Sequence, residues 1–178
     1  MKRTKEIAII GIYSALLIGV QFVLSFAAGI ELVSLMLAVF SVVYGAKRGI
    51  VTALIFSVLR IFIFGAIPSV MVLYVIYYPL YAFVCAQFGK INGRWHYLSL
   101  LICVAFMTVC FTLLDDLITP LMMSFSTSAT KAYFLASLPI LGIQAVCSTA
   151  SVAVLYLPIK RLLEKIKSSS RLDGEVEL

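Results

Sequence analysis

Hydrophobic segments long enough to cross a lipid bilayer recur along the whole chain and leave room only for short connections. A bilayer core of about 30 Å takes roughly 20 apolar residues as a helix, which satisfies its backbone hydrogen bonds without water. The segments are expected at about residues 7–28, 30–46, 49–65, 68–87, 97–119 and 133–159. We therefore predict an all-α integral membrane protein, a bundle of six transmembrane helices.

The composition favours a single membrane domain and little else. Of the 178 residues, 63% are hydrophobic and only 12% are charged. The helical domain is expected over residues 1–167, and the polar end, residues 168–178, is expected to be disordered because it offers little apolar surface to bury. No soluble catalytic domain fits, and no G-x-x-x-x-G-K-[ST] phosphate loop occurs. A partner protein would have to supply any ATP-driven work.

Basic residues occupy alternate connections between the hydrophobic segments. They precede the first segment, separate the second from the third and the fourth from the fifth, and follow the sixth: Lys2, Arg3, Lys5, Lys47, Arg48, Lys90, Arg94, Lys160, Arg161, Lys165, Lys167 and Arg171. With six spans all these segments face one side, so the positive-inside rule predicts that both termini are cytoplasmic. The net charge of +6 then follows from topology, and no nucleic-acid partner is expected.

Residue types that carry metal or redox chemistry are sparse. The single histidine, His96, follows Trp95 in a connection, which is typical of a membrane interface. The cysteines lie in apolar stretches, where we interpret them as small core residues: Cys85, Cys103, Cys110 and Cys147. No metal site and no cofactor are expected.

Arg60 departs from this pattern because it lies inside the third span. A guanidinium cannot lose its proton, so such a position is costly and usually functional. Arg60 follows Gly49 by about three helical turns, which places it about 16 Å from the cytoplasmic end, at or beyond the midplane. Thr52 and Phe56 precede it at intervals of four, so Arg60 ends a mixed polar face on the outer side.

Polar side chains on other spans repeat at helical spacing and converge on the same outer half. The fifth span carries Thr108, Thr112, Asp115, Asp116 and Thr119, the sixth carries Ser137, Gln144, Ser148 and Ser151, and the fourth carries Tyr74, Tyr77, Tyr78 and Tyr81. Adjacent residues of a helix point about 100° apart, so at most one aspartate faces the bundle axis. Together with Glu31, which follows the first span, these residues predict an outward-facing pocket in an apolar shell.

Structural alternatives stand beside this interpretation. Arg60 is expected to pair with Asp115 or Asp116 in the empty protein, and such a pair could serve only to hold helices together. Packing alone could explain the tyrosine face, and helix–helix hydrogen bonding could explain the polar residues of the sixth span.

The first span carries small residues at intervals of four: Gly11, Ala15 and Gly19. Such a surface allows close helix approach. It could be buried within the chain, or it could contact a partner protein.

These features resemble the S component of an energy-coupling factor (ECF) transporter: six short hydrophobic helices, both ends inside, the basic start KRTKEIAIIGIYSALL and the small residues of the first span. The resemblance implies a multi-pass subunit of a prokaryotic plasma membrane that captures a vitamin or other micronutrient on the outer side. It implies a T component and two ATPases as partners, with Gly11, Ala15 and Gly19 matching the T-component contact.

The resemblance also implies where the nutrient binds, among helices four to six and the outer loops. The matching positions are Tyr74, Tyr78, Asp115, Asp116 and Gln144, with Arg60 and Glu31 near enough to join them. One arginine, several carboxylates and a tyrosine face suggest a zwitterionic aromatic compound as substrate.

Two other functions remain open. A membrane scaffold of the same helical fold would bury Arg60 in an ion pair with no cavity beside it. An intramembrane enzyme could use Asp115 and Asp116 as acid and base, but no span contains a histidine or a second acidic motif, so we expect no enzymatic activity.

Overall fold

The computed structural model describes residues 2–26, 32–91 and 95–172, with the side chains of 4–26, 32–91 and 95–169. This part of the chain forms helices only: α1 (Lys2–Leu24), α2 (Val33–Tyr44), α3 (Ala46–Phe64), α4 (Pro68–Phe88), α5 (Trp95–Met122) and α6 (Thr127–Leu172). Glu31, Arg94 and the boundary predicted between the first two spans lie outside the described residues.

Within the described residues, four segments are long and apolar enough to cross a membrane: Thr4–Leu24, Pro68–Phe88, Trp95–Met122 and Thr127–Ser169. The described part of the chain is therefore all-helical and compatible with a membrane-embedded protein. The third predicted span is a helix of 19 residues, but it includes Lys47 and Arg48 as well as Arg60. The second is shorter than predicted, at 12 residues, or about 18 Å.

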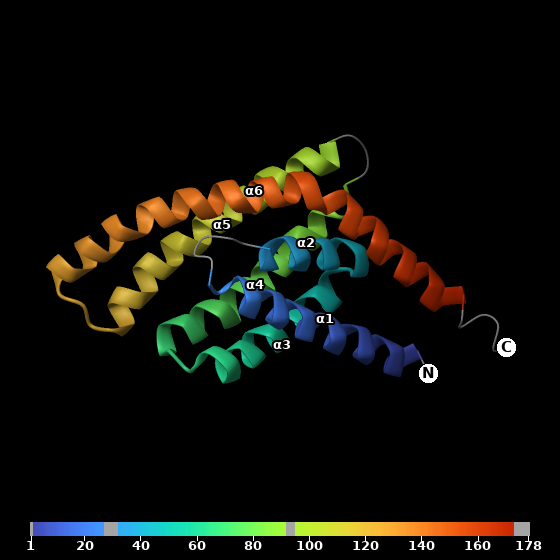
Figure 1. Cartoon of the computed structure of the whole chain (residues 1–178), viewed down its shortest axis with the longest axis horizontal. Helices are drawn as coiled ribbons and strands as arrows, with labels where there is room; N and C mark the ends of the chain where they lie inside the picture. Colours follow the sequence, from blue (N-terminus) through green and yellow to red (C-terminus); the bar gives the residue numbers. More distant parts are fainter. Residues whose placement is uncertain (1, 27–31, 92–94, 173–178) are drawn as a thin grey trace.

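The shortness of α2 follows from its central position (Figure 1). It contacts every other helix, and nearly all its side chains are buried, so it packs against protein along its whole length. Gly45 then allows a tight turn into α3, since its φ of 90° is strained for any other residue.

Around α2, the remaining helices form two groups (Figure 1). Helix α3 packs against α1 and α4, whereas α5 and α6 form a long antiparallel pair that α4 joins through α5. Helix α6 has 46 residues, so it begins before the predicted sixth span and continues beyond it into the segment predicted to be disordered.

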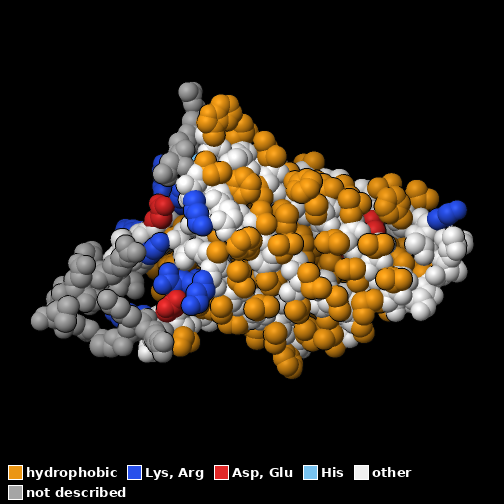
Figure 2. Space-filling model, turned by 180° about the vertical axis from the view of Figure 1, so that it is seen from behind, with side chains coloured by type: hydrophobic (Ala, Val, Ile, Leu, Met, Phe, Trp, Pro, Cys, Tyr) orange, Lys and Arg blue, Asp and Glu red, His pale blue; other side chains and the backbone are white. Residues whose placement is uncertain are grey.

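The start of α1, the start of α3 and the end of α6 lie at one end of the molecule, and the turn between α5 and α6 lies at the other (Figure 1). Figure 2 shows Lys and Arg side chains gathered at the first of these, which we call the basic end, and hydrophobic side chains over the middle of the visible face. The far end, called the opposite end below, carries Lys131 in the first turns of α6.

Candidate functional site

A row of side-chain hydrogen bonds follows the seam between α5 and α6. The pairs are Thr108 Oγ1 to Ser148 Oγ (3.1 Å), Thr112 Oγ1 to Gln144 Oε1 (3.1 Å), Ser137 Oγ to Asp116 Oδ2 (2.6 Å) and Tyr133 OH to Asp115 Oδ2 (2.7 Å). The predicted spacing of four residues puts Thr108, Thr112 and Asp116 on one face of α5, and the antiparallel α6 supplies their three partners in reverse order. Both polar faces thus meet each other, as helix–helix hydrogen bonding in a membrane requires.

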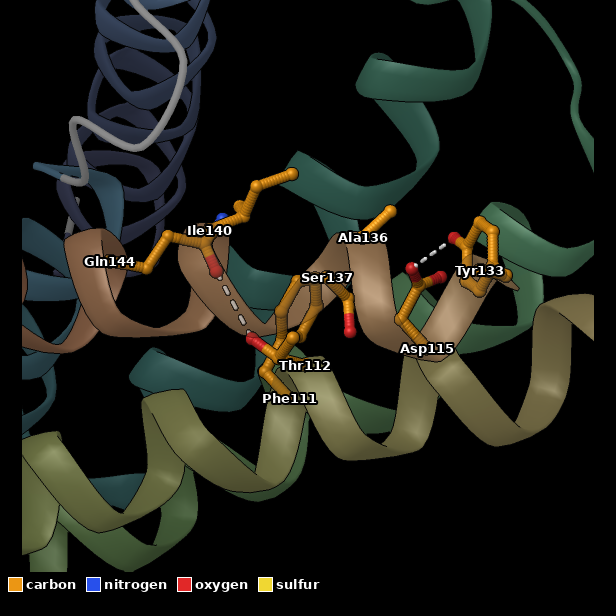
Figure 3. Close-up of a pocket in the computed structure, with 8 residues that line it drawn as sticks. All are labelled: Phe111, Thr112, Asp115, Tyr133, Ala136, Ser137, Ile140 and Gln144. Atoms are coloured by element: carbon orange, nitrogen blue, oxygen red, sulfur yellow. Dashed lines mark hydrogen bonds between the residues drawn. The ribbon is translucent and has the colours of Figure 1, made fainter. Parts of the chain in front are cut away.

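A cavity of about 170 Å³ opens between these two helices toward the opposite end (Figure 3). Its walls combine polar and apolar side chains from both: Phe111, Thr112, Asp115, Tyr133, Ala136, Ser137, Ile140 and Gln144. The cavity therefore places carboxylate, hydroxyl and amide groups within an otherwise apolar part of the bundle.

The two adjacent aspartates have different surroundings, as their angular separation predicts. Asp115 is half-buried, and its carboxylate oxygens accept hydrogen bonds from Thr119 (2.8 Å) and Tyr133 (2.7 Å). Asp116 is only 7% exposed; Ser137 occupies its Oδ2, while its Oδ1 is buried without a partner in the described part of the chain. A buried acceptor left unsatisfied costs about 1–3 kcal/mol, more for a charged group.

Arg60 does not pair with either aspartate, so the predicted ion pair is wrong. Its guanidinium carbon instead lies 4.0 Å from the ring centroid of Tyr74 and 5.3 Å from that of Phe64. Two facts explain the difference: α3 packs on α1 and α4 without reaching α5, and hydroxyl donors already hold the aspartates. Cation–π contact stabilises the charge, but the buried Nε finds no hydrogen-bond acceptor among the described residues.

The tyrosine face is buried in the core, where aromatic packing accounts for much of it. Tyr77 donates to the Met107 carbonyl (2.7 Å) and Tyr81 to the Ser34 carbonyl (2.9 Å). Tyr74 accepts a hydrogen bond from Gln21 Nε2 (3.1 Å) and lies under Arg60. Tyr74 and Tyr78 both contact the ring of Phe111, at 5.8 and 6.0 Å, and Phe111 lines the cavity.

The predicted site residues thus fall into two clusters, and the packed rings of Tyr78 and Phe111 lie between them. Asp115 and Gln144 line the cavity, with Asp116 beside them, whereas Arg60 and Tyr74 form the second cluster. The prediction omitted Tyr133, although it precedes Ser137 by four residues and so continues the polar face of the sixth span.

The small residues of α1 lie outside the bundle. Gly11, Ala15 and Gly19 are exposed, and a Cβ atom added to either glycine would meet open space. The buried face of this helix is formed by Tyr13, Leu17 and their neighbours. Packing within the described chain therefore leaves the small-residue face free.

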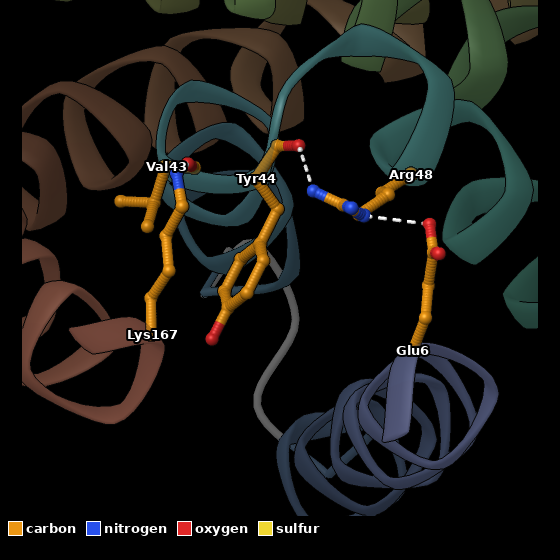
Figure 4. A network of polar contacts seen from close by, with 5 residues as sticks. All are labelled: Glu6, Val43, Tyr44, Arg48 and Lys167. Carbon is orange, nitrogen blue, oxygen red and sulfur yellow. Dashed lines mark hydrogen bonds and ion pairs between the residues drawn. The ribbon is translucent and has the colours of Figure 1, made fainter. Parts of the chain in front are cut away.

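Paired charges characterise the basic end (Figure 4). Arg48 Nε donates to Glu6 Oε1 at 2.7 Å, and its Nη1 donates to the Tyr44 carbonyl at 3.3 Å. Lys167 donates to the Val43 carbonyl, so α6 is tied to the end of α2. These contacts join α1, α2, α3 and α6 where the basic residues gather.

No group of three or more His, Cys, Asp or Glu side chains in the described part of the chain could hold a metal ion. Comparisons with protein families, with curated proteins and with solved structures give no match.

Proposed function

We propose that this chain is the substrate-binding membrane subunit of an ECF-type transporter and captures a small water-soluble nutrient from outside the cell. The observation that carries the proposal is the cavity between α5 and α6, whose mainly apolar walls carry carboxylate, hydroxyl and amide groups toward the end opposite the basic residues. Helix–helix hydrogen bonding accounts for the polar seam but gives the space beside it no role.

The proposed topology has six membrane passes, with both termini cytoplasmic in a prokaryotic plasma membrane. Its support is the shared location of the two helix ends and the basic side chains, which the positive-inside rule assigns to the cytoplasm. The cavity is then outside-facing. The short α2 passes within protein and is not required to match the lipid thickness.

The proposed partners are a T component and two ATPase subunits. The exposed Gly11–Ala15–Gly19 face supports a helix–helix contact with such a membrane partner, since small residues let backbones approach closely. The same face also supports the second candidate, a scaffold that binds membrane proteins without carrying a solute. The scaffold hypothesis leaves the polar cavity without a role. We assign no catalytic function to Asp115 and Asp116.

Native mass spectrometry of the gently purified protein tests the proposal. We expect a stoichiometric small molecule, identified after extraction, that an Arg60→Ala or Gln144→Leu variant retains less well than the wild type. Glu164→Gln is the matched control, because Glu164 is exposed at the basic end of α6. A protein that holds no small molecule, yet co-purifies with a membrane partner in a manner abolished by Ala15→Leu, would favour the scaffold.

A further inference from the structure

The charge on the wall of the α5–α6 cavity is negative. Asp115 contributes a carboxylate, and neutral groups come from Thr112, Tyr133, Ser137 and Gln144. No lysine or arginine lines this cavity in the described part of the chain, and Arg60 is held over Tyr74 in the other cluster. A negative wall with no cation attracts positive charge and repels an anion.

Asp116 adds a second, independent observation. Its side chain is more than nine-tenths buried, and its Oδ2 is held by Ser137, which lines the cavity. Its other oxygen, Oδ1, has no hydrogen-bond partner among the described residues. Asp116 is not among the residues that line the cavity, and its carboxylate lies behind Ser137, where a positive charge bound in the cavity would stabilise it electrostatically.

We infer that the cavity is the subsite for a protonated nitrogen of the captured solute, with Asp116 as its counter-ion. This inference rests on the proposed function. An ammonium group has three donors, which suit the carboxylate, hydroxyl and amide oxygens of the lining residues. Phe111 also lines the cavity, so its ring can contact the cation.

The size of the cavity limits what it holds. Its volume of about 170 Å³ is below the roughly 300–1,000 Å³ of pockets that enclose a drug-sized ligand. It therefore takes one end of the solute, and the rest extends beyond it. A bare metal ion fits poorly, because both oxygens of Asp115 are already engaged and no group of three His, Cys, Asp or Glu side chains occurs among the described residues.

Thermal unfolding of the detergent-solubilised protein tests this inference with two defined probes. An aqueous yeast extract is separated by cation exchange at pH 3 into a retained fraction, which contains the amines, and a flow-through fraction. We expect the retained fraction to raise the Tm of the wild type and of the Glu164→Gln control. In Asp116→Asn the half-maximal concentration should rise about tenfold or more, and Asp116→Glu should keep the response.

Several outcomes decide against the inference. Stabilisation by the flow-through fraction alone, or an unchanged response in Asp116→Asn, overturns it and leaves solute binding intact. The absence of stabilisation by either fraction, together with the absence of a retained molecule in mass spectrometry, overturns the proposed function as well. If Asp116→Asn does not fold, Gln144→Leu takes its place; it should weaken the response about threefold, and an unchanged response overturns the inference.

Discussion

The two ends of the molecule satisfy their charges in different ways. At the basic end Arg48 has a carboxylate partner in Glu6, and Lys167 reaches a backbone carbonyl. Toward the opposite end Arg60 lies over aromatic rings with its Nε unbonded, and Asp116 keeps one oxygen unpartnered among the described residues. Charges paired at a surface add little beyond local order, whereas half-satisfied charges in an apolar bundle reduce stability unless something else completes them.

Neutralising Arg60 should have the largest effect on this contrast between the two ends. In Arg60→Met we expect solute affinity to fall about tenfold or more, because the proposed nutrient site extends beyond the cavity to Arg60 and the variant lacks its charge. Stability should be unchanged or higher, since the variant removes a costly charge from the apolar bundle, whose Nε has no acceptor among the described residues. Affinity by calorimetry and unfolding in mixed micelles measure the two effects. A variant that is strongly destabilised would show that Arg60 serves the fold instead.

Removing the only donor that the described residues give Asp116 should have the next largest effect. Ser137→Ala leaves both oxygens of that buried carboxylate unsatisfied, so we expect a loss of about 1–3 kcal/mol in unfolding free energy. Ser168→Ala is the control, because Ser168 is exposed near the end of α6. Equal stability of the two variants would mean that Asp116 does not depend on Ser137.

Breaking a neutral hydrogen-bonded pair between α5 and α6 should reduce stability less. Thr112→Val removes the hydroxyl that donates to Gln144, and side-chain hydrogen bonds between membrane helices average about 0.6 kcal/mol. The same mixed-micelle unfolding measures this loss. A loss as large as that of Ser137→Ala would show that charge is not what distinguishes the Asp116 contact.

The smallest effect is expected at the basic end. Glu6→Gln removes the partner of Arg48, but both side chains are about two-fifths exposed, so the loss should be about 0.5 kcal/mol or less and should shrink in high salt. Unfolding at low and high ionic strength checks this. A larger, salt-independent loss would remove the contrast between the two ends.

Periodicity predicted much of this arrangement, because helical spacing decides which side chains share a face. The Thr108–Thr112–Asp116 row and its partners on α6 were predicted as polar faces, and the structure brings them together. Periodicity does not specify which helices touch. The ion pair of Arg60 with an aspartate failed for this reason: α3 and α5 belong to different groups around α2.

The sequence pattern also could not predict the length of α2. A segment surrounded by protein and a segment facing lipid are equally hydrophobic, so composition cannot distinguish a short central helix from a full span. Only the packing of five neighbours around Val33–Tyr44 reveals it.

Helix α6 connects the cavity at one end of the molecule with the basic end at the other. Near its start Tyr133 and Ser137 form one wall of the cavity, and near its end Lys167 holds the carbonyl of Val43. Pro139 and Pro158 interrupt the backbone hydrogen bonds of this 46-residue helix, which bends along its course (Figure 1). A change at the cavity therefore reaches the contact with α2 along α6 only through these two proline positions.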